Sequence, residues 1–356
     1  MRVLITGICG FAGSRIAIAL RREFENIEIF GIDNFLRPGS ETNRAPLAGM
    51  GINIRHGDVR LESDWAQLPG TADWLIDAAA EPSVLAGVNQ STSPRQLIDI
   101  NLGGTVEALE YCRRHRAGFI LLSTSRVYSI EALASLPVVA LDGGYAIDAS
   151  QPLPQGVTEH GVDAGFSTAS PISLYGATKL ASESLAAEYS FAFGLPGYIN
   201  RCGVLSGAGQ FGTAAQGIFA YWINAYLRRR KLRYIGFDGL GHQSRDVLHI
   251  DDLASLIALQ IRRPQAGRAP LYSAGGGPER TMSLRQLTAW CDQRFGAHPI
   301  DSDPAPRAYD IPWFVTDSRR VEADFDWTPQ HSLESTLAEI AAHAEAHPHW
   351  LEWSGA

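Results

Sequence analysis

A tyrosine and a lysine four residues apart could together carry out acid–base chemistry. Tyr175-Gly176-Ala177-Thr178-Lys179 places a phenol and an ammonium group on one face of a predicted helix. A nearby ammonium favours phenolate over phenol, so we expect the pKa of Tyr175 to be lowered. The phenol would then serve as a general base near neutrality. A tyrosine and a lysine at this spacing are common on helix surfaces, so a further residue is needed before they indicate a catalytic site.

Thr124 supplies that further residue. It lies near the end of Leu121-Leu122-Ser123-Thr124-Ser125-Arg126, an apolar run typical of a buried strand. Ligands bind at the carboxyl ends of strands in α/β sheets. We therefore expect Thr124 to hydrogen-bond the oxygen that Tyr175 deprotonates, while Lys179 also holds the nicotinamide ribose of a dinucleotide. The alternative is a hydroxyl-rich strand end beside a surface lysine, with no catalytic role.

Glycines near the N-terminus predict the binding site of that dinucleotide. The stretch Thr6-Gly7-Ile8-Cys9-Gly10-Phe11-Ala12-Gly13 follows a predicted strand and leads into a predicted helix. Glycine permits a tight turn and a close backbone approach to a pyrophosphate, whose charge is favoured at a helix N-terminus. This position in the chain favours a dinucleotide site over a purely structural turn.

Two carboxylates could meet the adenosine half of the cofactor. Asp33 closes the second predicted strand, where it can accept hydrogen bonds from the ribose hydroxyls and would repel a 2′-phosphate. This favours NAD over NADP, although the nearby Arg37 would suit a phosphate. An aspartate that only starts a turn is the alternative for Asp33. Asp58 could meet the adenine edge or be a plain loop carboxylate.

The elements that must position these residues alternate in type along the first 200 residues. Short apolar runs predict strands at 3–6, 27–32, 52–56, 74–78, 119–123 and 197–201. Helical periodicity marks 13–22, 101–114 and 174–193. The alternation predicts the α/β class, a Rossmann-type doubly wound parallel sheet with helices on both faces and a smaller C-terminal substrate lobe.

The pattern loosens after residue 201, where glycine and proline turns become frequent. We expect an NAD-binding domain over 1–200 and a smaller substrate lobe over 201–244 and 263–356. The strand-then-helix pattern of 245–262 is expected to return to the NAD-binding domain. Residues 129–170 form a polar insertion of a length that is usually functional or mobile.

Composition disfavours several other classes of protein. The chain has 356 residues, of which 45% are hydrophobic and 19% charged, as in an ordinary globular protein. A net charge of -8 disfavours nucleic acid or a membrane as the main partner. We expect no signal peptide and no membrane span. Four cysteines without metal-like spacing predict reduced thiols in a cytoplasmic protein with no metal site.

Taken in order, these motifs resemble the extended short-chain dehydrogenase family of NAD-dependent nucleotide-sugar epimerases and dehydratases. Further similar stretches are Asn101-Leu102-Gly103-Gly104-Thr105, Arg245-Asp246-Val247-Leu248-His249, and Arg307 followed by Asp310. The resemblance implies a nucleotide-diphosphate sugar as substrate, with Arg245 and Arg307 on its diphosphate. A surface ion pair is the alternative for each arginine. Cofactor contacts are implied for Gly7, Gly10, Phe11, Gly13, Asp33, Asn34, Arg37, Asp58, Val59, Ala79, Asn101, Ser123, Tyr175, Lys179 and Arg201.

Within the family, two stretches are most similar to the CDP-paratose 2-epimerase branch. They are Asp33-Asn34-Phe35-Leu36-Arg37-Pro38-Gly39 and Gln210-Phe211-Gly212-Thr213-Ala214-Ala215-Gln216-Gly217. Substrate contacts are thereby implied for Ser83, Thr124, Gln210, Gln216, Arg245 and Arg307. Two departures stand out: Asp77 replaces a frequent histidine of the family, and Glu81 replaces a glutamine of the branch.

The residues after Thr124 bear on the reaction. Relatives that dehydrate or decarboxylate carry an acid within two residues of this threonine, whereas this chain has Ser125-Arg126. We therefore expect epimerisation by transient oxidation, at C2 by resemblance. The alternatives are a C4 epimerase, a net dehydrogenase or dehydratase, and an NAD-binding regulator without activity. The family also implies a homodimer, formed through the helices near 104–114 and 178–193.

Overall fold

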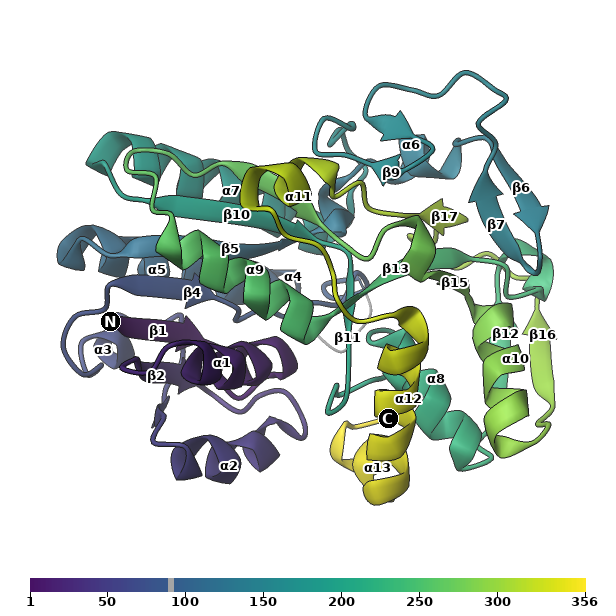
Figure 1. Cartoon of the computed structure of the whole chain (residues 1–356), viewed down its shortest axis with the longest axis horizontal. Helices are drawn as coiled ribbons and strands as arrows, with labels where there is room; N and C mark the ends of the chain where they lie inside the picture. Colours follow the sequence, from purple (N-terminus) through teal and green to yellow (C-terminus); the bar gives the residue numbers. More distant parts are fainter. Residues whose placement is uncertain (89–92) are drawn as a thin grey trace.

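A parallel sheet of seven strands forms the centre of the computed structural model, which describes residues 1–88 and 93–356 (Figure 1). Every neighbouring pair of strands in this sheet is parallel, so all the carboxyl ends lie along one edge. The expected α/β class with a Rossmann-type sheet is confirmed. The order is β14 (Leu271–Ala274), β10 (Gly197–Cys202), β5 (Gly118–Thr124), β4 (Trp74–Asp77), β1 (Arg2–Thr6), β2 (Glu28–Asp33) and β3 (Asn53–His56).

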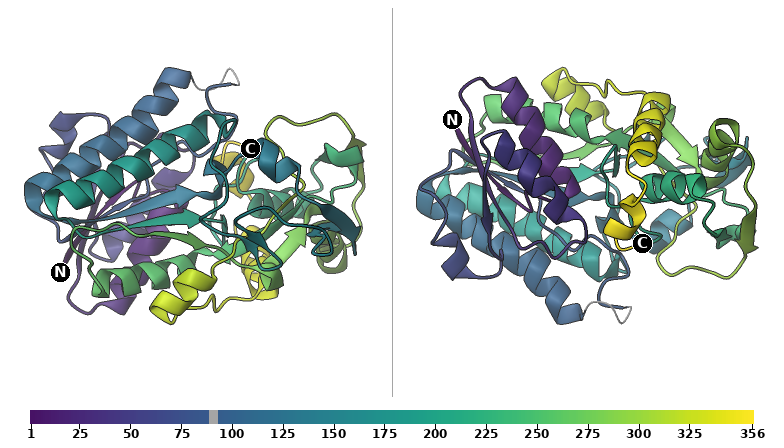
Figure 2. Two further views of the ribbon diagram at one scale, coloured as in Figure 1. Left: turned by 90° about the horizontal axis from the view of Figure 1, so that it is seen from above. Right: turned by 90° about the horizontal axis from the view of Figure 1, so that it is seen from below.

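Helices cover both faces of this sheet (Figure 2). On one face α1 (Phe11–Glu23) packs against α9 (Ile250–Arg262), and on the other α5 (Gly104–His115) packs against α7 (Ser173–Phe193). Successive side chains of β1 enter opposite cores: Val3 and Ile5 belong to the α1 and α9 side, and Leu4 to the α5 side. Burial on both faces explains why the strands are continuous apolar runs.

A smaller lobe lies beyond the carboxyl edge of the large sheet (Figure 1). Its apolar core joins three helices through Trp222, Leu287 and Leu337. Its four-stranded sheet contains β11 (Val204–Ser206), β13 (Ser244–His249), β15 (Thr281–Ser283) and β17 (Trp313–Phe314). The other elements of the lobe are α8 (Ile218–Leu227), α10 (Leu284–Phe295), α12 (Leu333–Ala346), α13 (Trp350–Trp353), and β12 (Leu232–Ile235) paired with β16 (Ile300–Asp303).

Two segments depart from the expected division of the chain. The sequence places 245–262 with the NAD-binding domain, and helix α9 does pack there, but strand β13 belongs to the smaller sheet. The sequence also places 263–356 in the smaller lobe, yet β14 is the edge strand of the large sheet, beside β10. A buried strand of four residues carries no periodic signal that says which sheet it joins.

The insertion at 129–170 is attached to the smaller lobe. Tyr145 donates its backbone N–H to the carbonyl of His242 at 2.8 Å, and the Ser283 hydroxyl donates to the carbonyl of Gly143 at 2.7 Å. The insertion therefore extends the lobe. It consists of α6 (Ile130–Ala134), the hairpin β6 (Val138–Leu141) and β7 (Gly144–Ile147), and the pair β8 (Val157–Thr158) and β9 (Gly161–Val162).

Four short helices complete the described chain. They are α2 (Arg44–Gly49), α3 (Glu62–Trp65), α4 (Pro94–Ile98) and α11 (Arg319–Phe325). Among the helices of residues 1–88 and 93–356, none is both long enough and apolar enough to cross a lipid bilayer. All four cysteines are free and buried.

Candidate active site

A cleft of about 700 Å³ lies between the carboxyl edge of the large sheet and the smaller lobe. Most of the predicted cofactor contacts line it, namely Gly7, Gly10, Phe11, Gly13, Asp33, Asn34, Arg37, Val59, Ala79, Ser123, Tyr175 and Lys179. The predicted substrate contacts that line it are Thr124, Gln210, Gln216, Arg245 and Arg307. The fold therefore brings together residues that are up to 300 positions apart in the sequence.

The glycine turn after β1 leaves the start of α1 open to the cleft. A Cβ atom on Gly13 would lie 2.3 Å from the carbonyl oxygen of Gly7, so only glycine fits at this position. The first turn of α1 contains no acidic residue. Its amide groups and the positive end of the helix dipole are therefore available to an anion such as a pyrophosphate.

Asp33 is oriented by the backbone around it. Its two carboxylate oxygens accept hydrogen bonds from the amides of Cys9 and Phe35, each at 2.8 Å. Burial nevertheless raises the pKa of Asp33, and these hydrogen bonds oppose the rise. The carboxylate is thus held at the end of β2, where a ribose beside the glycine turn would meet it.

Asp33→Ser should abolish the preference for NAD over NADP. Hydrogen bonds to a charged group contribute about 1.5–3 kcal/mol each, so we expect a loss of about 10- to 100-fold in NADH affinity. NADPH affinity should rise or stay constant because the repulsion of its phosphate is removed. Fluorescence titration with both nucleotides measures this change. Asp58→Asn is the control, and an equal loss in that variant would place the ribose contact elsewhere.

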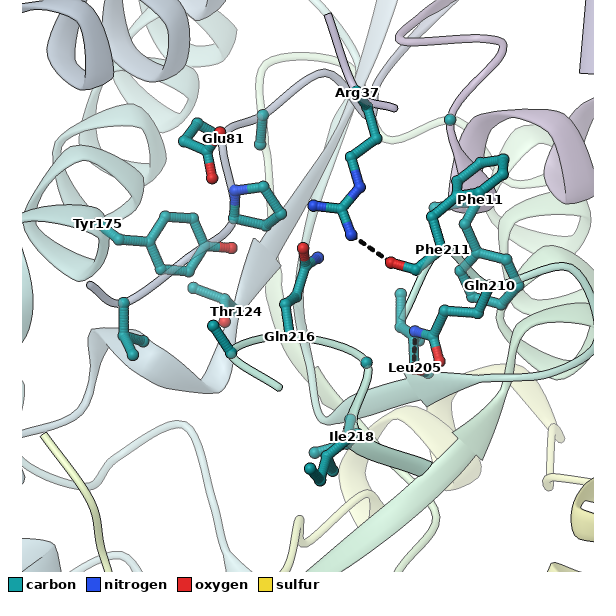
Figure 3. A pocket seen from close by; sticks show the side chains of 18 of the residues that line it. Phe11, Arg37, Glu81, Thr124, Tyr175, Leu205, Gln210, Phe211, Gln216 and Ile218 are labelled. Carbon is teal, nitrogen blue, oxygen red and sulfur yellow. Dashed lines mark hydrogen bonds between the residues drawn. The ribbon is translucent and has the colours of Figure 1, made fainter. Parts of the chain in front are cut away.

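The three side chains of the proposed acid–base set line the same cleft. A Cβ atom on Gly176 would lie 2.2 Å from the carbonyl oxygen of Arg126, so this glycine lets the turn after β5 contact the start of α7. The contact brings Thr124 beside Tyr175, and both point into the same part of the cleft (Figure 3). Lys179, one turn further along α7, is 2% exposed.

The charge state of Tyr175 differs from the expectation. The sequence predicts a pKa lowered by Lys179, but burial raises the pKa of Tyr175 to about 12. A hydrogen bond with Thr124 and the charge of Arg126 oppose the rise, whereas Cys202 and Glu81 add to it. Burial also lowers the pKa of Lys179, against the charge of Asp77. A buried phenol in this setting needs further positive charge nearby to act as a base at neutrality.

Four predicted contacts do not line the cleft, namely Asp58, Ser83, Asn101 and Arg201. Asp58 pairs with Arg60 at 2.6 Å, and this interaction lowers its pKa to about 2. The Ser83 hydroxyl accepts the amide of Leu85 at 3.2 Å. These two side chains are therefore engaged within the chain.

Arg201 lies in a buried ion pair behind the cleft. Its guanidinium contacts the Glu183 carboxylate at 2.7 Å, with the two side chains 6% and 5% exposed. The Ser123 hydroxyl donates to the same carboxylate. The interaction ties β10, β5 and α7 together below the catalytic set, so this geometry gives Arg201 a structural role instead of the expected cofactor contact.

Asp77, which stands where the family often has histidine, also has a structural role beneath the cleft. Its carboxylate oxygens accept hydrogen bonds from the hydroxyls of Thr6 and Thr105, each at 2.7 Å. These bonds join β1, β4 and α5 beneath the cleft. The departure from the family pattern thus leaves the buried carboxylate with partners.

Three of the arginines that line the cleft form a group, Arg245 and Arg307 from the smaller lobe and Arg126 from the turn after β5. Arg245 donates to Asp310 at 3.2 Å and to the carbonyl of Ile311 at 2.7 Å, and burial lowers its pKa to about 10. The charges of Arg126 and Arg307 lower it further. In the sequence, Arg126 marks only the absence of an acid after Thr124, whereas in the structure it is a cationic residue of the cleft. The group suits a multiply charged anion.

The two predicted glutamine contacts differ in availability. Gln210 donates to the carbonyl of Leu205 at 2.8 Å, and its amide oxygen accepts from the Ser206 hydroxyl. The amide oxygen of Gln216 is buried and has no donor among residues 1–88 and 93–356. Figure 3 shows the Gln216 amide in the middle of the cleft. Gln216 is therefore the better placed of the two to bind a ligand.

Glu81 and Arg37 also face this space (Figure 3). Arg37 donates to the carbonyl of Phe211 in the smaller lobe, and burial lowers its pKa. The direction of its guanidinium disfavours the alternative in which it receives a 2′-phosphate beside Asp33. In the sequence, Glu81 stands out only because it replaces a glutamine of the CDP-paratose 2-epimerase branch. Its contribution to the pKa of Tyr175 indicates that it lies near the catalytic set.

A separate cluster has the spacing of a metal site. His249, Asp251 and His331 each offer a ligand atom, and all three lie within 4.8 Å of one another. The histidines already have partners, because His249 faces Glu339 and His331 faces Asp252, each at 2.9 Å. None of these three residues lines the cleft.

Three known proteins resemble the chain over nearly its full length. A CDP-paratose 2-epimerase from Salmonella typhi is 30% identical, over 96% of this chain and 98% of that protein. A dTDP-glucose 4,6-dehydratase from Mycolicibacterium smegmatis is 24% identical, over 98% and 95%. A solved UDP-glucuronic acid 4-epimerase from Bacillus cereus, with UDP-glucuronic acid and NAD, has a TM-score of 0.72 at 21% identity, over 97% and 99%. The family model described as "NAD dependent epimerase/dehydratase family" matches residues 3–275.

Proposed function

Because the chain belongs to the NAD dependent epimerase/dehydratase family and has NAD as its cofactor, we propose that it epimerises a sugar linked to a nucleoside diphosphate. The observation that carries the proposal is the placement of Thr124, Tyr175 and Lys179 in one cleft with the group of three arginines. The arginines would bind the diphosphate, and the sugar would then lie beside Tyr175.

Each residue of the catalytic set has a separate role in a transient oxidation of the sugar. Tyr175 takes the proton of a ring hydroxyl and later returns it to the keto oxygen, while Thr124 hydrogen-bonds the same oxygen. Lys179 would hold the nicotinamide ribose. NAD, when bound, would supply hydride transfer from and back to the ring carbon, with no net consumption of a reductant.

We place the reaction at C2 of a CDP-linked sugar. The similarity to the Salmonella typhi 2-epimerase over nearly the whole chain supports this choice over C4. Elimination of water is less favoured because Ser125 and Arg126 stand where an acid would protonate the leaving hydroxyl. We further infer a homodimer through α5 and α7, to be checked by light scattering. The four free cysteines support a cytoplasmic location.

Isotope labelling tests the reaction directly. Purified protein with NAD should convert a C2-deuterated CDP-sugar to its C2 epimer and keep the deuterium, because the hydride returns to the same carbon. A C4-labelled UDP-sugar tests the alternative position. A product lighter by one water would identify a dehydratase, and stoichiometric NADH a dehydrogenase. No conversion of any CDP-, UDP- or GDP-sugar would contradict the proposal.

Arg126→Met should move the acid limb of kcat/KM to higher pH. The charge of Arg126 lowers the pKa of Tyr175, so its removal raises that pKa and leaves less phenolate at neutral pH. Because Arg126 also belongs to the group proposed to bind the diphosphate, kcat/KM should fall at every pH, and the position of the acid limb is the readout. Thr124, Cys202 and Glu81, which also affect the pKa of Tyr175, stay unchanged in this variant. Arg126→Lys should keep the limb in place, and an unmoved limb in Arg126→Met would contradict the prediction.

A further inference from the structure

We propose that Glu81 is a specificity residue that selects a sugar with free hydroxyl groups over its deoxy analogue. The inference rests on the proposed function, because that function places the sugar beside Tyr175. It adds the class of sugar, which the catalytic set by itself leaves open.

The Glu81 carboxylate lies near the charge of Arg37 but has few hydrogen-bond partners within the described chain. It lies in the loop after β4 and lines the cleft on the side of Tyr175 (Figure 3). The one hydrogen bond found for it among residues 1–88 and 93–356 is from the Ser83 amide to one of its oxygens, at a long 3.4 Å. The other oxygen is therefore available to a ligand in the cleft.

The backbone of Glu81 is nevertheless held firmly. The side chain of Asn101 accepts the Glu81 amide at 2.8 Å and donates to the Glu81 carbonyl at 3.1 Å. The same side chain donates to the Thr178 hydroxyl at 3.2 Å, and Thr178 lies between Tyr175 and Lys179 on α7. Asn101 thus fixes the position of Glu81 relative to the catalytic helix. Such preorganisation is what a specificity contact requires.

The chemistry of the facing groups defines the ligand. The oxygens of a carboxylate accept hydrogen bonds, and the buried amide oxygen of Gln216 has no donor among residues 1–88 and 93–356. Leaving such acceptors without hydrogen atoms is costly, so the ligand must supply donors. The guanidinium of Arg37 faces the same space and disfavours an ammonium group. Neutral hydroxyl groups suit all three side chains, because they can donate to Glu81 and Gln216 and accept from Arg37.

Binding of a matched series of sugars tests this role. Calorimetry on the NAD-loaded protein compares CDP-glucose with its four monodeoxy analogues. We expect at least one analogue to bind about 10- to 100-fold more weakly than CDP-glucose, as for the loss of a hydrogen bond to a charged group. Glu81→Gln keeps the shape of the side chain and should reduce that difference about tenfold. Binding of CDP alone should not change in Glu81→Gln. The exposed control Glu25→Gln has the same change of charge and should keep every ratio of CDP-glucose affinity to deoxy-analogue affinity.

The outcomes separate this inference from the proposed function. A reduced ratio in Glu81→Gln without any epimerisation by the wild type would support the inference and contradict the reaction. Epimerisation with unchanged ratios would support the reaction and overturn the inference. A Glu81→Gln effect confined to the pH dependence of kcat/KM would also overturn it, because the carboxylate would then act only on the charge of Tyr175.

Discussion

Tyr175→Phe should lower kcat/KM for the epimerisation by about 10²- to 10⁴-fold, the usual contribution of a general acid–base group. The phenylalanine ring fills the same space in a position that is 7% exposed, but it lacks the oxygen that exchanges a proton with the sugar. The fold and the glycine turn are untouched, so NAD affinity should fall by no more than the loss of one hydrogen bond, about tenfold. Turnover of the labelled sugar and fluorescence titration with NADH measure the two quantities.

Tyr221→Phe is the matched control, because Tyr221 lines the same cleft from the smaller lobe. It loses the same atom at a position without an acid–base role in the proposed mechanism. Comparable losses in the two variants would mean that removal of any hydroxyl from the cleft impairs binding, and Tyr175 would then lose its assignment as the base. Near-normal turnover by Tyr175→Phe would contradict the mechanism outright.

Glu183→Ala should reduce the free energy of unfolding by about 3–5 kcal/mol, the range found when one partner of a buried ion pair is removed. The variant leaves the Arg201 guanidinium charged and almost fully buried, 6% exposed, without its carboxylate. The Ser123 hydroxyl loses its acceptor as well. Urea unfolding of the NAD-free protein, followed by circular dichroism, measures the change.

Two controls define what the loss means. Glu23→Ala removes one partner of the exposed pair with Arg262 and should cost less than about 1 kcal/mol. The double variant Glu183→Leu with Arg201→Met should recover most of the stability, because no charge is then left buried. If Glu183→Ala alters NAD affinity and leaves unfolding unchanged, Arg201 belongs to the cofactor site that the sequence predicts.

The amino-acid sequence by itself determined the parts of this protein that depend on local rules. Strand and helix periods predicted the alternating elements, and the run expected at 197–201 is strand β10 at Gly197–Cys202. The glycine turn was predictable because close backbone approach depends on neighbouring residues, as for Gly13 against Gly7. Tyr175 and Lys179 share a helix, so their relative placement followed from spacing alone.

Only the tertiary structure decided the features that depend on burial and on distant partners. Packing against β5 and α7 gave Arg201 a carboxylate partner, and the smaller lobe provided the carbonyl that holds Arg37. Burial reversed the expected direction of the Tyr175 pKa. The tertiary structure also turns Glu81 toward the cleft, where Asn101, twenty positions later in the chain, holds its backbone. Desolvation and long-range hydrogen bonds follow from how the whole chain packs, which spacing along the sequence does not encode.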